Sequence, residues 1–131
     1  MQTVVLKKDL VYPELSYKIV GSLFEVFKQL GGGYQEKYYQ RAVATELKNS
    51  GLSFKEQVHM PLKYKGEKIG SFYLDFLVED KIVLELKKDK SVSRRTIEQI
   101  VAYLKAFNLS LGIVANFTDK GVRFKRILNL S

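Results

Sequence analysis

The sequence predicts a single domain of the α/β (α+β) class, in which helices flank a mixed central sheet that contains an antiparallel three-strand meander. Two observations predict this class. The apolar repeat changes along the chain from that of helices to that of strands, and one further helix separates the meander from a strongly apolar segment. A third observation sets the domain count, because the 131 residues contain no repeat, linker or low-complexity segment and suit one core. We therefore expect one domain over residues 1–131.

Two helices are expected before the sheet. Pro13 suits the first turn of a helix, and apolar residues recur at helical spacing as far as Leu30. Three glycines at 31–33 then break the helix, and we interpret them as a flexible stop. They do not form a nucleotide-binding loop, because no Lys-Ser or Lys-Thr pair follows them. The second helix is expected over 35–49, and Gly51 ends it.

The meander is expected to begin at Phe54, where the apolar repeat becomes that of a strand. A turn at Lys65-Gly66 ends the first strand, and two β-rich apolar runs at 72–78 and 82–86 form the central hairpin.

The last third of the chain predicts one helix and two strands. Ser91 or Ser93 can cap a helix over 94–108. The apolar segment 109–117 is expected to be a buried strand, parallel to a meander strand because the helix forms the crossover. Residues 122–128 alternate and are expected to form an edge strand.

Charged residues interrupt the apolar runs of the central hairpin. Asp75 lies within the first run, and Glu85 and Lys87 share one face of the second. A three-residue loop would pair Val78 with Ile82. That register places Asp75 opposite Glu85, with Cβ atoms roughly 4.5–5.5 Å apart. A two-residue loop would instead place the two acids on opposite faces of the hairpin.

Two adjacent carboxylates in apolar strands repel each other and cost desolvation energy unless a cation joins them. Lys87 could be that cation, in which case the three charges form a buried cluster that only fixes the strand register. A divalent metal is the alternative, because ions such as Mg²⁺ prefer oxygen ligands. Strand chemistry alone does not separate these two interpretations.

Composition excludes several classes of site and favours one class of partner. The chain has no cysteine, which excludes disulfides, Cys-based zinc sites and thiol nucleophiles. The single histidine, His59, cannot build a His-rich metal site or a Ser–His–Asp array alone, and we interpret it as structural. The formal charge of +8 favours a polyanionic partner, chiefly nucleic acid, although an anionic membrane surface or simple solubility would also account for it. No stretch reaches the roughly 18 apolar residues of a membrane span, so we expect a cytoplasmic protein without a membrane partner.

The order of the expected elements, together with three blocks of residues, is similar to the PD-(D/E)XK nuclease superfamily. The blocks are Asp75, then Glu85-Leu86-Lys87, then Gln99-Ile100-Val101-Ala102-Tyr103. More narrowly, Gly33-Tyr34-Gln35-Glu36-Lys37-Tyr38-Tyr39 resembles the naming motif of the small GxxExxY family of that superfamily. The resemblance covers about residues 15–129. One departure is Leu74, which stands where the motif has a proline.

The resemblance implies a restriction-endonuclease-like fold and a metal-dependent nuclease that acts on DNA, with Mg²⁺ or Mn²⁺ as cofactor. It implies that the ligands of the metal are Asp75, Glu85, the backbone carbonyl of Leu86 and Glu36, the last as a direct ligand or as an acid behind the others. Lys87 would position or polarise the attacking water and stabilise charge on the phosphate.

The resemblance also gives roles to helix residues. Gln99 and Tyr103 match a Q-x-x-x-Y block whose members shape the site and contact the nucleic-acid strand, although a surface glutamine beside a half-buried tyrosine is an equally ordinary arrangement. A first group of cations near the site could grip phosphates: Lys88, Lys90, Arg94 and Arg95. A second group could also grip phosphates, but a solvated face explains it slightly better: Lys120, Arg123, Lys125 and Arg126.

Two other functions compete with the nuclease. The first is a catalytically silent module for nucleic-acid binding or assembly, and the second is a structural protein whose buried charges pin the hairpin. A domain of 131 residues leaves little room for substrate selection, so a partner protein or a homodimer could complete it.

Overall fold

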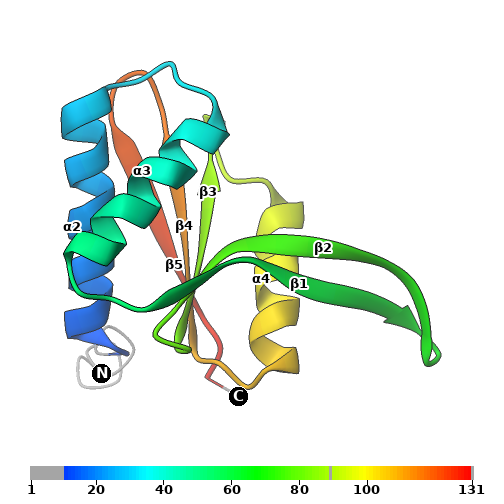
Figure 1. Cartoon of the computed structure of the whole chain (residues 1–131). Helices are drawn as coiled ribbons and strands as arrows, with labels where there is room; N and C mark the ends of the chain where they lie inside the picture. The colour runs from blue at the N-terminus through cyan, green and yellow to red at the C-terminus, as the bar shows by residue number, and fades with distance from the viewer. Residues whose placement is uncertain (1–10, 89, 131) are drawn as a thin grey trace, which may run out of the picture.

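The structure, a computed structural model, describes residues 11–88 and 90–130. Over these residues it confirms the predicted class, because one mixed five-stranded sheet carries helices on both faces (Figure 1). The strand order across the sheet follows the chain, from β1 to β5. The elements are α2 (Pro13–Leu30), α3 (Glu36–Asn49), β1 (Phe54–Tyr64), β2 (Glu67–Val78), β3 (Ile82–Lys87), α4 (Arg94–Ala106), β4 (Leu111–Phe117) and β5 (Val122–Leu128).

The strand pairings agree with the predicted antiparallel meander, parallel crossover strand and edge strand, and they add the partners of the last two strands. β1, β2 and β3 form the antiparallel meander, β4 runs parallel to β3 after the α4 crossover, and β5 pairs antiparallel with β4. Val78 pairs with Ile82, so the register that follows from a three-residue hairpin loop is confirmed.

Two cores lie on opposite faces of the sheet. α2 and α3 cover one face, where Leu84 and Leu86 of β3 contribute to the packing. α4 covers the other face, where Val83 of β3 and Val114 of β4 pack against Ile100. Glu85 and Lys87 follow Val83 at alternate positions, so both belong to the α4 face. Among the described residues no helix is long and apolar enough to cross a membrane.

The glycine run after α2 is a packing contact as well as a stop. Gly31 has φ 74° and its N–H donates to the Phe27 carbonyl at 2.7 Å. A Cβ at Gly32 would lie 2.7 Å from the Asp119 Cα, so only glycine allows this loop to lie against the turn between β4 and β5. The loop therefore ties the start of α3 to the turn between β4 and β5.

The distal halves of β1 and β2 project from the body as a two-stranded arm (Figure 1). β3 pairs with only the last part of β2, and alternation along β1 predicts one continuous apolar face as far as Tyr64. In the structure the core contact on β1 ends near Met60, while Leu62 is 40% and Tyr64 60% exposed. The arm extends beyond the end of α4, so none of the described helices covers the apolar face at Tyr64.

Candidate active site

The backbone pairing of β2 with β3 stops at the pair Phe76–Leu84. Beyond it, hydrogen bonds to two carboxylates join the strands. The backbone N–H of Asp75 donates to Glu85 Oε1 at 2.9 Å. The backbone N–H of Leu86 donates to Asp75 Oδ2 at 2.7 Å. Side chains thus satisfy two amides at the point where the strands separate, and both acids are fixed next to each other.

β2 is also irregular on its other side at this residue. Phe76 pairs with Glu56 and Leu74 pairs with Val58, but the residues between them, Asp75 and Gln57, are not ladder partners. Gln57 has φ 50°, a conformation that a non-glycine residue adopts only at some cost. Asp75 therefore occupies a gap in the sheet between β1 and β3. Sequence reasoning missed Gln57, because nothing in its side chain or spacing signals the distortion.

Glu85 is the most perturbed acid of the site. Its side chain is 6% exposed. Burial, and after it the neighbouring Asp75, raise the pKa of Glu85 to about 8, although the Asp75 N–H and the charge of Lys87 act to lower it. Without a bound cation, Glu85 therefore holds a proton at neutral pH.

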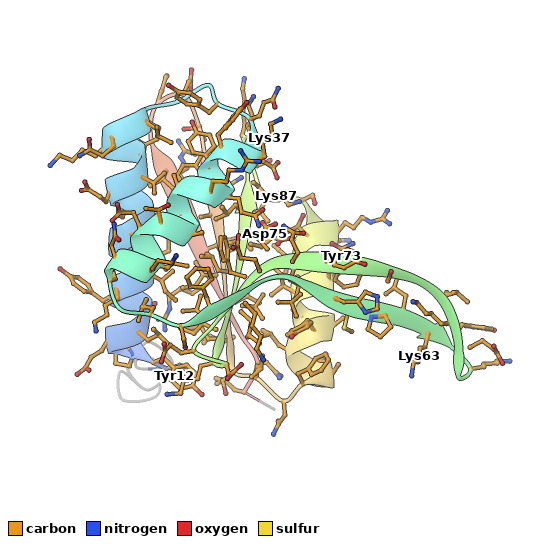
Figure 2. The ribbon with its side chains drawn as sticks, in the orientation of Figure 1. Tyr12, Lys37, Lys63, Tyr73, Asp75 and Lys87 are labelled. Atoms are coloured by element: carbon orange, nitrogen blue, oxygen red, sulfur yellow. The ribbon has the colours of Figure 1, made fainter. Side chains whose placement is uncertain are left out.

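Lys87 lies two residues beyond Glu85 on the same face of β3, and it is half-buried. Figure 2 shows Lys87 and Asp75 in the centre of the view, with Lys37 of the first turn of α3 above them, and the charges of both Lys87 and Asp75 act on Glu85. α3 contacts β3, and Figure 1 shows its N-terminal end near the C-terminal end of β3. The structure thus gathers Asp75, Glu85 and Lys87 at the end of the sheet where α3 begins.

Glu36 does not join this group as a third acid. It is the first residue of α3 and is exposed. Within residues 11–88 and 90–130, no group of three or more acidic or histidine side chains is close enough to hold a metal ion. A Mg²⁺ site does not require three acids, because this ion commonly keeps several waters and binds one or two carboxylates. The two carboxylates of Asp75 and Glu85 therefore fit a Mg²⁺ site of this kind.

Tyr103 lies in the core of the α4 face rather than beside the acid pair. It is 2% exposed and stacks on Phe107 with a centroid distance of 4.5 Å. Burial raises the pKa of Tyr103, and so does Asp80, which lies in the hairpin loop at the opposite end of β3 from Lys87. Gln99 is one helical turn nearer the start of α4 and half-buried.

The structure places the two groups of cations in different surroundings. Lys88, Lys90, Arg94 and Arg95 are exposed around the connection from β3 to α4. In the second group, Arg126 lies on the α2 side and donates from Nη2 to the Val11 carbonyl at 2.8 Å. Lys120, Arg123 and Lys125 instead line hollows that Lys90 shares. The sequence does contain a signal for this difference. Side chains alternate between the two faces of a strand, so Arg123 and Lys125 of β5 lie on the opposite face from Arg126.

Comparison with known proteins agrees with this arrangement of elements. The PD-(D/E)XK nuclease superfamily matches residues 13–127. The solved structure of SSO0001 is similar with a TM-score of 0.53 and 17% identity, over 72% of this chain and 50% of that one. Hjc, a Holliday junction resolvase from Archaeoglobus fulgidus, is similar with a TM-score of 0.46 and 18% identity, over 70% of this chain and 76% of that one.

The chain thus spans half the length of the SSO0001 structure. Among curated proteins, none matches the sequence significantly. The likeness to SSO0001 shows a shared fold, and the superfamily match runs from the first residue of α2 nearly to the end of β5. The chain belongs to the PD-(D/E)XK nuclease superfamily.

Proposed function

We propose that this protein is a metal-dependent nuclease of the GxxExxY family that hydrolyses phosphodiester bonds in nucleic acid, DNA in preference to RNA. The observation that carries the proposal is the joined pair Asp75 and Glu85 in a gap of the sheet, with Lys87 on the same face as Glu85. Superfamily members typically use divalent metals, and we propose Mg²⁺ here, with Mn²⁺ as a substitute. The net charge of +8 suits a polyanionic substrate.

Asp75 and Glu85 would hold the ion, together with the backbone carbonyl of Leu86. Each carboxylate uses one oxygen for a backbone amide, Oδ2 in Asp75 and Oε1 in Glu85. These amide bonds orient the carboxylates, as partners behind metal ligands usually do. Glu36 would act from the first turn of α3 through water. When bound, the ion would lower the pKa of a water molecule and neutralise charge on the phosphate.

The residues around the pair have separate tasks. Glu85 must release its proton before its carboxylate can bind a cation, and the nearby charge of Lys87 favours that release. Lys87 carries a compact ammonium on a flexible stem, which suits contact with a phosphate oxygen or the attacking water. Hydrolysis would then depend on two acids and one lysine, all of which lie at the same end of the β2–β3 hairpin.

A specific observation favours a second candidate function, a catalytically silent nucleic-acid-binding or assembly module. The two carboxylates and two amides satisfy each other without a metal, and Glu85 is protonated near neutral pH. Such a pair is stable without a metal and can serve only to join β2 and β3. In this case the protein would act in the cytoplasm with a homodimeric copy or a partner protein.

Cleavage assays separate the two candidates. Labelled single- and double-stranded DNA and RNA of one sequence are incubated with Mg²⁺, Mn²⁺ or chelator. The isosteric variants Asp75→Asn and Glu85→Gln should abolish metal-dependent cleavage, and Lys87→Met should reduce kcat on the order of 10²–10³-fold. Glu98→Gln and Lys105→Met change exposed charges on α4 and should cleave normally.

Two results would contradict the nuclease. Cleavage that persists in chelator, or that survives both acid substitutions, excludes this metal mechanism. Absence of cleavage with every metal, combined with DNA affinity that the three site variants leave unchanged, supports the silent module instead.

A further inference from the structure

Two hollows open at the end of the sheet beside Lys87, and they share Lys90 and Arg123. The first has a volume of about 300 Å³ and is lined by Lys90, Thr118, Asp119, Lys120 and Arg123. The second has a volume of about 310 Å³ and also includes Lys125. We call the four cations Lys90, Lys120, Arg123 and Lys125 the basic groove.

Among the described residues, positive charge outweighs negative charge at the basic groove. Asp119 is the one acid among the residues that line the two hollows. Among the described residues the ion pair within 4.0 Å joins Lys55 and Asp80, at another part of the molecule. Four cations and one described acid around two hollows that share lining residues give a local excess of positive charge, which attracts an anion.

The turn that carries Lys120 is held in one conformation. Thr118 Oγ1 accepts hydrogen bonds from the N–H groups of Lys120 and Gly121, each at 3.2 Å. The same hydroxyl donates to the Gly121 carbonyl at 2.8 Å. Gly32 packs against the backbone of this turn. The turn is therefore braced before any ligand arrives, which lowers the entropic cost of binding.

The strand register connects the basic groove to the acid pair. Lys87 of β3 pairs with Asn116 of β4, and Asn116 pairs with Arg123 of β5. Glu85 pairs with Val114, which in turn pairs with Lys125. Residues paired in register lie on one face of a sheet.

All these side chains therefore lie on the α4 face. Arg123 is two strand spacings, roughly 10 Å, from Lys87. A single extended polyanion can contact both residues.

We infer that the basic groove binds the phosphate backbone of a nucleic-acid strand next to the phosphate that lies at Asp75 and Glu85. The strand then runs across β3, β4 and β5 on the α4 face. The inference rests on the proposed function for the identity of the polymer and for the direction of the path. Of the two interpretations that the sequence leaves open for Lys120, Arg123 and Lys125, it favours phosphate binding over a solvated face.

Binding measured without turnover tests the inference. Fluorescence anisotropy of a labelled single-stranded DNA oligonucleotide, and of RNA of the same sequence, is followed in chelator over a range of salt concentrations. Lys120→Gln combined with Arg123→Gln should weaken binding on the order of tenfold at 0.1 M salt, and should reduce the slope of log K against log salt by about 1.4. Lys90→Gln combined with Lys125→Gln should do the same.

The matched control removes two charges elsewhere. Lys48→Gln with Lys105→Gln changes exposed lysines in the last turns of α3 and α4, far from the groove, and should leave affinity within about twofold. If both groove variants bind as tightly as this control, the inference is wrong. Because the assay needs no metal, a failure of the nuclease proposal would appear in the cleavage assay and not here. Weakened binding of DNA but not RNA, or the reverse, identifies the polymer.

Discussion

Asp75 and Glu85 are joined reciprocally across two strands. The Asp75 amide donates to the Glu85 carboxyl at 2.9 Å, and the Asp75 carboxylate accepts from the amide next to Glu85, that of Leu86, at 2.7 Å. One arrangement therefore serves two purposes. It closes the gap where β2 leaves β3, and it holds the two acids next to each other.

Asp75→Ala and Asp75→Asn should differ in stability. Alanine leaves the buried Leu86 amide without its acceptor, which costs about 1–3 kcal/mol. Asparagine keeps a carbonyl oxygen for this amide and removes the charge that opposes ionisation of Glu85, so we expect it to be at least as stable as the unmodified protein. Urea denaturation in chelator measures both. Equal destabilisation by the two variants would show that charge, rather than the hydrogen bond, is what the hairpin requires.

Stability in chelator should depend on pH through Glu85. The group binds a proton up to pH about 8 when folded but only to about 4.5 when unfolded. Between these values the folded state binds more protons, so the free energy of unfolding falls as pH rises, by at most about 1.4 kcal/mol per pH unit. The stabilisation is complete below 4.5 and is lost as pH rises through 8. Glu85→Gln should remove this component, and a parallel decline in the variant would contradict the assignment.

Mg²⁺ should raise the melting temperature if the acid pair holds a metal. A ligand at 100 times its Kd stabilises the folded state by about 2.7 kcal/mol. Differential scanning fluorimetry with MgCl₂, compared with NaCl of equal ionic strength, measures the shift. Glu85→Gln should lose most of it. A shift of the same size in Glu85→Gln would place the bound ion elsewhere.

Repeat patterns in the sequence sufficed to predict the elements and the relative position of the acids. Val78 and Ile82 bound a three-residue loop, and that loop length fixes the register and hence the face on which Asp75 and Glu85 lie. The parallel pairing of β4 followed from the helical crossover. These features depend on chain connectivity and on local periodicity, which a single sequence contains.

Other features depend on tertiary contacts and could not be predicted. The positive φ of Gln57 and the amide bonds of the acid pair arise where three strands separate, and no residue type signals that separation. Glu36 matches a family motif, but its exposed position outside any three-acid group depends on how α3 lies on the sheet. The projecting arm of β1 and β2 could not be predicted. The alternation of apolar residues along β1 does not show where α4, which covers part of β1, ends.

The tyrosine of the Q-x-x-x-Y block should be structural. Tyr103→Phe keeps the stacking on Phe107 and loses only the hydroxyl, so we expect cleavage close to that of the unmodified protein and a stability change below about 1 kcal/mol. Tyr103→Ala removes a buried ring and should cost about 3–5 kcal/mol. Single-turnover cleavage and urea denaturation measure the two effects. A loss of 10²-fold or more in a folded Tyr103→Phe protein would assign the hydroxyl an acid–base role.

The glycine run should be sensitive to substitution at its centre. Gly32→Ala would place a Cβ 2.7 Å from the Asp119 Cα, which is backbone and cannot rotate away, so we expect a loss of about 1–3 kcal/mol. Gly21→Ala is the matched control. Its Cβ meets nothing within 4 Å, and alanine in the α2 interior should stabilise by about 0.5–1 kcal/mol.

Gly32→Ala should also weaken binding of the DNA oligonucleotide, because the turn that it displaces carries Lys120 of the basic groove. Thermal unfolding and anisotropy of Gly32→Ala and Gly21→Ala check both effects. Destabilisation with unchanged affinity would show that the turn keeps its place while the loop yields. In that case Gly32 serves the attachment of α3 and not the shape of the groove.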